Sequence, residues 1–205
     1  KERGALIVFE GCDGAGKTTQ CKHIVEHLNQ NGQKAEYINF PDRSTPCGSI
    51  INSYLKNKVD LPDEGIHLLF AFNRWEAKNK MEKLLNGGTT LIVDRYSYSG
   101  VAFSAAKGFD FDWCKAPEQG LHKPDLVIFL SLTPEAQAKR RGFGTERYEN
   151  TAMQQKAYEM FQRMKDEVWV ELNADKNEGD VLKDIIPIVN ESIQNSKFKP
   201  LKQLW

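Results

Sequence analysis

The sequence has no excess of charge, no long apolar run and few cysteines, and each shortage excludes a class of protein. Lysine plus arginine and aspartate plus glutamate number 28 each, so no overall positive field favours nucleic acid or an anionic membrane as a partner. The longest apolar runs have five residues, as at 5–9, whereas a membrane-spanning helix needs about 20. We therefore expect no nucleic-acid partner, no membrane span and no secretory leader.

The four cysteines, Cys12, Cys21, Cys47 and Cys114, lie far apart without a C-x-x-C pair. Their spacing gives neither a disulfide framework nor a zinc site, and it indicates a reducing compartment. We expect a cytoplasmic location, with the nucleus and the mitochondrion left open. The 205 residues contain no internal repeat, low-complexity tract or linker, which predicts a single α/β domain over 1–205.

A glycine-rich loop is the most informative stretch. Residues 11–18 read G-C-D-G-A-G-K-T and follow the apolar run 5–9. In the G-x-x-x-x-G-K-T pattern, backbone N–H groups and the start of a helix surround a polyphosphate. Lys17 is expected to reach the outer phosphates of a nucleoside triphosphate, and the Thr18 hydroxyl is expected to bind Mg²⁺. The predicted triphosphate-binding residues are Gly11, Gly14, Ala15, Gly16, Lys17, Thr18 and Thr19.

Strand and helix patterns alternate along the chain. Apolar or alternating runs predict strands at 5–9, 34–39, 89–93, 126–132 and 169–173. Helical spacing of apolar residues predicts helices over 17–31, 46–55, 63–86, 98–106, 134–139, 148–167 and 181–193, the last interrupted near Pro187. This order predicts one doubly wound parallel sheet whose ligands bind beyond the carboxyl ends of its strands.

Polar residues follow two of the predicted strands at their carboxyl ends. Asp94 and Arg95 end the third predicted strand, and Arg43 follows the second. An acid there can hold Mg²⁺ through water, and arginines there can grip a phosphate. A solvated surface pair contributes only about 0–1 kcal/mol, whereas arginines on a transferring phosphoryl group change rates by about 10³–10⁵. We therefore interpret Arg43 and Arg95 as phosphate ligands, and Asp94 with Thr18 as the Mg²⁺ site.

A third cationic cluster, Arg140, Arg141 and Arg147, lies in a glycine-containing segment. Such a segment can be a solvated turn. It can also be a flexible lid, about residues 138–149, that closes over the phosphates and excludes water. We favour the lid, because a kinase must suppress transfer of the phosphoryl group to water.

Longer motifs carry a resemblance to a known family. They are R-G-A-L-I-V-F-E at 3–10, F-P-D-R-S-T at 40–45, L-L-F-A-F-N-R-W-E at 68–76, D-R-Y at 94–96, S-G-V-A-F at 99–103, K-P-D-L at 123–126 and E-R-Y-E-N at 146–150. Nearly end to end, the chain resembles thymidylate kinase of the eukaryotic and poxviral type. The resemblance implies a P-loop NTPase fold, with three α/β/α layers and a five-stranded parallel sheet. It also implies Mg²⁺-dependent transfer of the γ-phosphoryl group of ATP to dTMP, giving ADP and dTDP for dTTP biosynthesis, in a homodimer.

The resemblance also assigns roles in dTMP binding. Asp13 would accept a hydrogen bond from the 3′-hydroxyl, Arg43 and Arg95 would hold the phosphate, and Tyr148 would crowd the 2′ position against ribonucleotides. Phe70 would stack on thymine, although an aromatic residue on a helix is more often part of the core. Arg74 would donate to a thymine carbonyl. The expected dTMP-binding residues are Asp13, Phe40, Arg43, Phe70, Arg74, Arg95, Ser99, Gly100, Phe103, Tyr148 and Gln154.

One departure from the family pattern concerns the loop. Proteins of this type usually carry a basic residue after the loop aspartate, where this sequence has Gly14. In the bacterial branch of the family, the lid supplies that cation. We therefore hypothesise that a lid arginine, Arg140 or Arg141, is a catalytic cation beside Lys17 and Arg95.

Two further motif matches are rejected, and two alternative functions stay open. Residues 23–27 read H-x-x-E-H, a zinc-protease pattern, but no third ligand is apparent. Residues 57–60 read N-K-x-D, as in GTPases, but no apolar strand precedes them. The alternatives are a kinase for a different nucleoside or nucleoside monophosphate, and a nucleotide-binding regulatory protein that has lost catalysis. The second predicts a damaged Lys17 or Thr18, and both are present.

Overall fold

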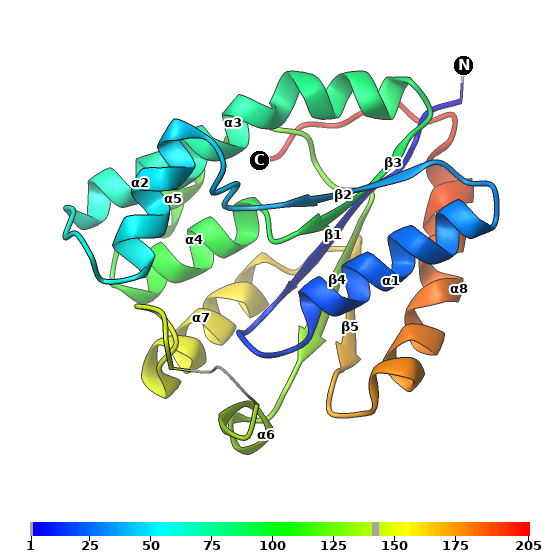
Figure 1. Ribbon diagram of the computed structural model, residues 1–205. Helices are drawn as coiled ribbons and strands as arrows, with labels where there is room; N and C mark the ends of the chain where they lie inside the picture. Colours follow the sequence, from blue (N-terminus) through cyan, green and yellow to red (C-terminus); the bar gives the residue numbers. More distant parts are fainter. Residues whose placement is uncertain (1, 141–143) are drawn as a thin grey trace.

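The computed structural model describes residues 2–140 and 144–205. In these ranges five strands form one parallel sheet in the order β2-β3-β1-β4-β5 (Figure 1). No helix in the same ranges is long and apolar enough to cross a membrane. The elements in chain order are β1 (Leu6–Gly11), α1 (Lys17–Gln30), β2 (Ala35–Asn39), α2 (Pro46–Leu55), α3 (Asp63–Asn86), β3 (Thr90–Asp94), α4 (Ser97–Ala106), α5 (Phe111–Lys115), the 3₁₀-helix η1 (Ala116–Glu118), β4 (Leu126–Ser131), α6 (Pro134–Ala138), α7 (Thr151–Met164), β5 (Trp169–Asn173) and α8 (Glu178–Ser196).

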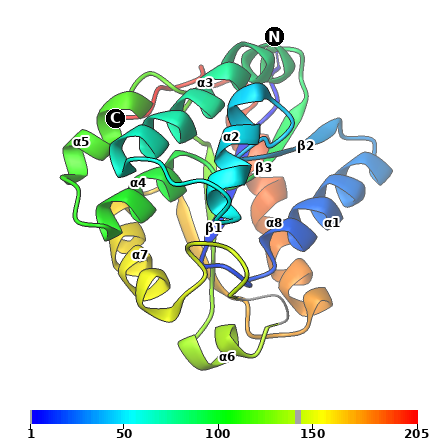
Figure 2. The same cartoon turned by 60° about the vertical axis from the view of Figure 1, so that its left-hand side comes forward.

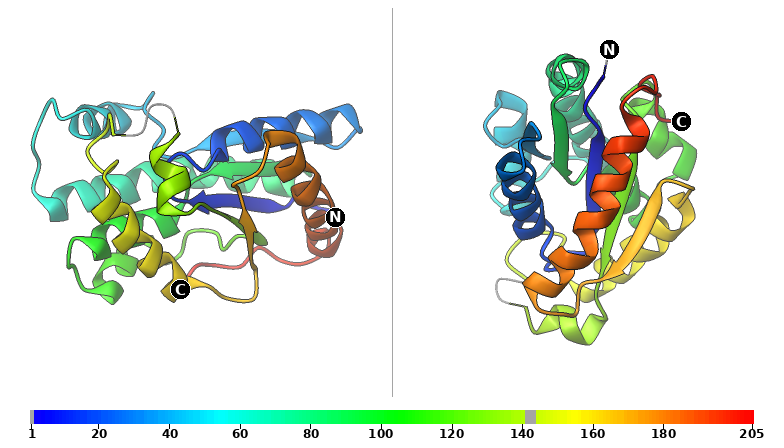
Figure 3. Two further views of the ribbon diagram at one scale, coloured as in Figure 1. Left: turned by 90° about the horizontal axis from the view of Figure 1, so that it is seen from below. Right: turned by 90° about the vertical axis from the view of Figure 1, so that its right-hand side faces the viewer.

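The central strands β1, β3 and β4 are almost entirely buried because each face of the sheet meets a layer of helices (Figure 3). Leu6 and Val8 of β1 pack with α3, α4 and α7, whereas Ile7 and Phe9 pack with α1 and α8. All four side chains are fully buried. The three-layer fold and the parallel sheet predicted from the sequence are therefore confirmed.

The sheet register brings the functional strand ends together. Asp94 at the end of β3 lies beside Phe9 of β1 on one side and beside Asn39 of β2 on the other. Parallel strands end at the same edge, so the loops that follow β1, β2 and β3 meet there. This edge carries the glycine-rich loop and the predicted arginines.

The last helix differs from the prediction. Helix α8 runs without a break from Glu178 to Ser196, although Pro187 lies inside it. A proline in a helix interior costs about 3 kcal/mol. Ile185 and Val189 are fully buried against the sheet on either side of the proline, and each such side chain contributes about 1.5–3 kcal/mol. Their burial holds the helix together across Pro187.

The C-terminal residues return to the sheet beside α3 (Figures 1 and 2). Leu204 is buried, and its N–H donates to the Leu121 carbonyl at 2.8 Å. The N–H of Lys123 donates to the Lys202 carbonyl, also at 2.8 Å. The end of the chain therefore fixes the segment that connects η1 to β4.

Candidate active site

The glycine-rich loop joins β1 to α1 and surrounds the Lys17 side chain. Lys17 is almost fully buried, and its Nζ donates to the carbonyls of Gly11 at 3.0 Å and Cys12 at 2.8 Å. Burial, together with the nearby Arg95, lowers the pKa of Lys17. A bound anion would raise the pKa of Lys17 again, because its negative charge favours the charged amine. Because α1 begins at Lys17, its first N–H groups add to the same anion-binding position.

The predicted magnesium ligands lie together at the end of β3. Thr18 Oγ1 donates to Oδ2 of the buried Asp94 at 2.5 Å. Tyr37 of β2, which the sequence analysis missed, donates to the same oxygen at 3.1 Å. Burial and the Asp94 carboxylate raise the pKa of Tyr37, so its hydroxyl stays a neutral donor. Adjacent hydroxyl and carboxylate oxygens suit Mg²⁺, which takes few protein ligands beside phosphate and water oxygens.

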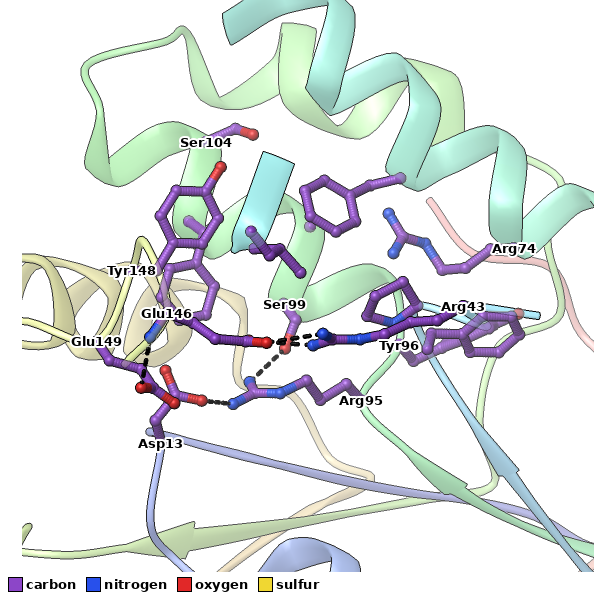
Figure 4. A pocket seen from close by; sticks show the side chains of 16 residues that line it. Asp13, Arg43, Arg74, Arg95, Tyr96, Ser99, Ser104, Glu146, Tyr148 and Glu149 are labelled. Carbon is purple, nitrogen blue, oxygen red and sulfur yellow. Dashed lines mark hydrogen bonds and ion pairs between the residues drawn. The ribbon is translucent and has the colours of Figure 1, made fainter. Parts of the chain in front are cut away.

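Arg95 adopts an uncommon backbone conformation next to this site. Its φ of 66° lies in the left-handed region, which costs a residue with a side chain about 1–2 kcal/mol. The backbone N–H donates to the Phe9 carbonyl at 3.0 Å. The guanidinium forms an ion pair with Asp13 and donates to Ser99 Oγ at 3.1 Å (Figure 4). The strained backbone is thus held where the side chain reaches the phosphate loop.

Glu10 supports the start of α4 from the end of β1. Its fully buried carboxylate accepts hydrogen bonds from the N–H groups of Tyr96 at 2.9 Å and Ser99 at 3.0 Å. The Ser99 hydroxyl donates to it at 2.6 Å. Burial raises the pKa of Glu10, although Arg95 and these donors act against the rise. Glu10 therefore holds Ser99, and through Ser99 it holds Arg95.

Asp13 and Gln154 connect the phosphate loop to α7. Gln154 Nε2 donates to Asp13 Oδ2 at 2.5 Å, and Gln154 Oε1 accepts from the Asp13 N–H at 2.8 Å. Gln137 of α6, a residue that was not predicted, donates to the same Oε1 at 3.0 Å. Burial would raise the pKa of Asp13, but Arg95 and Lys17 hold it below its ordinary value. Asp13 is therefore an ionised acceptor, as a partner for a hydroxyl group requires.

A cavity lies beside the phosphate loop, between α3, α4 and residues 146–149 of the predicted lid segment (Figure 4). Every predicted dTMP-binding residue except Gln154 lines it, and Gln154 is joined to it through Asp13. The rings of Phe103 and Tyr148 stack in its wall, with centroids 5.3 Å apart. The lining residues are Asp13, Phe40, Pro41, Arg43, Leu55, Phe70, Arg74, Arg95, Tyr96, Ser99, Gly100, Phe103, Ser104, Glu146, Tyr148 and Glu149.

A second hollow opens over the phosphate loop and adjoins this cavity. Asp13, Arg43 and Arg95 line both. Of the predicted triphosphate-binding residues, Gly11 and Ala15 lie in the loop but do not line the hollow. The others line it together with Asp94 and Arg140: Gly14, Gly16, Lys17, Thr18 and Thr19. The arrangement provides two connected binding spaces that share two arginines.

Arg140, in the predicted lid, lies directly over Gly14 of the loop. A Cβ atom placed on Gly14 would lie 3.3 Å from Cβ of Arg140, and the φ of Gly14 is +80°. Both the space and the backbone conformation therefore favour glycine here. Arg140 Nη2 donates to the Ala174 carbonyl at 3.0 Å. Arg141, the other predicted lid cation, lies outside the described residues.

Arg147 turns away from the phosphate loop. Its Nη2 donates to Asp60 Oδ1 at 2.7 Å, and its guanidinium lies 4.0 Å from the centre of the Tyr54 ring. Asp60 is the acid of the N-K-x-D match, so this acid is engaged in a surface ion pair. Across residues 2–140 and 144–205 no group of three or more His, Cys, Asp or Glu side chains could hold a metal ion. The H-x-x-E-H match at 23–27 lies in that range.

Arg43 contacts a carboxylate of the predicted lid segment. Its Nη1 and Nη2 donate to the two carboxylate oxygens of Glu146 at 2.7 and 3.0 Å (Figure 4). Nη1 also donates to Asn52 Oδ1 at 2.7 Å. Glu146 belongs to the E-R-Y-E-N motif, from which no role was predicted for this residue. In this structure Glu146 occupies the two Arg43 donors, Nη1 and Nη2, that could otherwise bind a phosphate.

A parallel sheet of this order, a phosphate loop after its first strand and two arginines at neighbouring strand ends define a P-loop kinase. The family model described as "Thymidylate kinase" matches residues 9–185. The chain belongs to the thymidylate kinase family. Its reaction is that of a dTMP kinase, a phosphotransferase that uses ATP.

The similar proteins include eukaryotic and viral ones. Thymidylate kinase of Arabidopsis thaliana is 50% identical over 206 residues, which cover 100% of this chain and 78% of the plant protein. The human thymidylate kinase is 49% identical over 99% of this chain and 98% of its own length. A solved structure of the Candida albicans enzyme has 35% identity, full coverage of both chains and a TM-score of 0.90.

Proposed function

We propose that ATP and dTMP bind with their phosphates facing each other where the two hollows join. The observation that supports this most directly is that Asp13, Arg43 and Arg95 line both spaces. The dTMP phosphate oxygen forms a new bond to the γ-phosphorus as the bond to the ADP oxygen breaks. Such a transfer depends on alignment and charge stabilisation more than on covalent chemistry by the protein.

The donor binds the glycine-rich loop in this proposal. Backbone N–H groups of residues 11–19 surround the phosphates, and Lys17 moves from its carbonyl partners to the outer phosphates. Thr18 and Asp94 hold Mg²⁺, and Tyr37 orients the Asp94 carboxylate. When bound, Mg²⁺ neutralises negative charge on the transferring phosphates.

The acceptor binds the cavity. Arg43 and Arg95 hold its phosphate, and Asp13 accepts a hydrogen bond from the 3′-hydroxyl. The lowered pKa of Asp13 supports this role, because the carboxylate stays ionised. Tyr148, fixed against the Phe103 ring, stands where a 2′-hydroxyl would clash. Gln154 orients Asp13 from behind.

Phe70 and Arg74 read the base in this arrangement. Phe70 is only half-buried and lines the cavity, which supports stacking on thymine. Arg74 lies on the far side of the cavity from Asp13 (Figure 4) and donates to a thymine carbonyl. The remaining proposed lining contacts come from Phe40, Ser99, Gly100 and Phe103.

We also propose that residues 1–205 act as one kinase domain with a lid at about 138–149. Strand β5 and helix α8 follow the lid yet complete the same sheet and core as β1. The lid is therefore an insertion within one folded unit. Its Arg140 is placed over the loop to supply the cation that Gly14 does not.

A panel of acceptors tests the proposed function. Coupled assay of ADP release should show turnover with dTMP and little with dGMP or AMP. With dUMP, which lacks one methyl group, kcat/KM should be lower by about 10–200-fold. Chelation of Mg²⁺ by EDTA should abolish turnover with every acceptor. Absence of dTMP-dependent ADP release would overturn the proposal.

An exposed apolar row on α3 supports a homodimer, the proposed partner. Leu68, Phe72 and Trp75 are 50%, 54% and 38% exposed and follow helical spacing. A contiguous apolar row on a helix surface favours burial against another protein surface. Met81, further along α3, is fully buried in the core instead. We propose that α3 packs against the same helix of a second copy.

Changing Phe72 to glutamate is expected to separate the dimer. The substitution places a charge in the centre of the apolar row, where burial would leave it without a partner. Sedimentation equilibrium should show a monomer at concentrations where the unmodified protein is a dimer. Phe198→Glu is the matched control, because Phe198 is 77% exposed and lies outside α3, and it should stay dimeric. A dimer that persists in Phe72→Glu contradicts the assignment.

A further inference from the structure

A buried ion pair forms part of the wall of the acceptor cavity. Arg74 lies on α3 and Glu118 at the end of η1, and their side chains are 3% and 0% exposed. Arg74 Nε donates to both carboxylate oxygens of Glu118 at 2.9 Å, and Nη2 donates to Oε1. Nη1 makes no hydrogen bond within the described residues, and Arg74 lines the cavity. One edge of the guanidinium is therefore occupied, and one nitrogen is left for a ligand.

Residues of α4 restrict the position of the guanidinium. A Cβ atom on Gly100 would collide with Nη2 of Arg74, so glycine allows the guanidinium to lie against α4. The Ser97 hydroxyl donates to Glu118 Oε2 at 2.6 Å. Ser97 of α4 thus fixes the Glu118 carboxylate. The Arg74 guanidinium lies between that carboxylate and Gly100 of α4.

Residues distant in the sequence fix the backbone that carries Glu118. Trp75 Nε1 donates to the Pro117 carbonyl at 2.7 Å. The Leu204 N–H donates to the Leu121 carbonyl at 2.8 Å, and the Gly120 N–H donates to the Leu204 carbonyl at 3.4 Å. The backbone on both sides of Glu118 is therefore fixed, by α3 before it and by the end of the chain after it.

Stability alone does not account for this pair. Two charges removed from water pay a desolvation cost that their attraction only partly returns, and apolar replacements of such pairs are often neutral or stabilising. Arginine also has no acceptor atom. A fixed Nη1 can therefore donate to the carbonyl at position 4 of thymine. Cytosine carries an amino group at position 4, which is itself a donor, so Nη1 finds no acceptor there.

We propose that Glu118 is a positioning residue for base selection. It holds Arg74 so that Nη1 meets a base carbonyl, and it thereby raises the preference for dTMP over dCMP. The inference rests on the proposed function, in which Arg74 reads the base. Glu118 itself touches no substrate.

The substitution Glu118→Gln tests the inference, because it keeps the shape but removes the charge and one acceptor oxygen. We expect KM for dTMP to rise about tenfold and the ratio of kcat/KM for dTMP over dCMP to fall about tenfold. The kcat for dTMP and the KM for ATP should change less than about threefold. Steady-state kinetics with both acceptors give these values, and thermal unfolding measures stability in parallel.

Asp125→Asn is the matched control for lost stability. It breaks a second, partly buried arginine pair, in which Arg3 donates to the two Asp125 carboxylate oxygens at 2.8 and 2.7 Å. Neither residue lines the cavity. It should lower Tm but leave the dTMP to dCMP ratio unchanged. If Glu118→Gln fails to fold, Ser97→Ala removes one hydrogen bond from Glu118 and should shift the ratio in the same direction by about twofold. An unchanged ratio in the folded variant overturns the inference.

Arg74→Gln separates this inference from the proposed function. If Arg74→Gln leaves KM for dTMP and the ratio unchanged, the proposed base-reading role fails. If Arg74→Gln raises KM and lowers the ratio while Glu118→Gln does neither, only the inference about Glu118 fails. If Glu118 acts through Arg74, the double variant should lose no more selectivity than Arg74→Gln alone.

Discussion

Replacing Arg140 by alanine is expected to lower kcat about 10³-fold, while KM for dTMP changes less than about threefold. Arg140 lies over Gly14 of the phosphate loop. It lines the same hollow as Lys17 and Thr18. A cation there stabilises the charge that develops on the γ-phosphoryl group, so its loss acts on the transition state. Single-turnover kinetics with saturating ATP and dTMP measure the effect on the chemical step.

Lys139→Ala is the control for this prediction. Lys139 is exposed, carries the same charge and precedes Arg140 directly, so its removal should leave kcat within about twofold. The same measurement on Arg141→Ala decides between the two lid arginines. The lid hypothesis fails if both Arg140→Ala and Arg141→Ala retain kcat within a few fold of the unmodified protein.

Replacing Arg95 by alanine should lower kcat/KM for dTMP about 10²–10³-fold or more. Arg95 borders both hollows, pairs with Asp13 and donates to Ser99. In the proposed arrangement its removal takes away a phosphate ligand, and it leaves Asp13 without its main cation. Burial then becomes the dominant influence and raises the pKa of Asp13. The residual activity should therefore fall, as the solution is acidified, at a higher pH than in the unmodified protein.

Two further variants test whether the loss of activity is specific to the Arg95 guanidinium. Arg95→Lys keeps the charge but loses the planar pair of donors, so it should recover only part of kcat/KM. Arg163→Ala removes an exposed arginine of α7 and should leave kcat/KM unchanged. Binding of an ATP analogue, followed by calorimetry, should survive in Arg95→Ala and shows that the variant is folded. A kcat/KM within about tenfold of the unmodified value contradicts the role of Arg95.

Local patterns were sufficient to predict the part of the site that follows directly from a strand. The glycine-rich loop, Asp94 and Arg95 each follow a buried apolar run, and the parallel sheet brings the ends of those runs together. The arginine of the second strand, Arg43, was predicted for the same reason. Phe70 is different, because helical spacing alone favours a core position, and only the family motifs gave it a role.

Partners contributed by other elements were not predictable in this way. Tyr37 reaches Asp94 only because β2 lies beside β3, and Glu118 reaches Arg74 across 44 positions of sequence. Such contacts depend on strand order and on the path of η1. Neither can be predicted from the residues that are adjacent in the sequence. Gln137 is the same case, since its contact with Gln154 requires α6 to lie against α7.

The Arg43–Glu146 pair has a thermodynamic consequence for acceptor binding. In the proposed reaction, the phosphate of dTMP replaces the Glu146 carboxylate as the anion bound to Arg43. Binding of dTMP is therefore an exchange of one anion for another. The displaced pair is partly exposed, and such pairs contribute only about 0–1 kcal/mol, so the exchange costs little. Dissolved salt screens the old pair and the new one alike. In the proposed arrangement, ionic strength therefore changes the Arg43 contribution to dTMP affinity little, and acceptor binding releases Glu146 from Arg43.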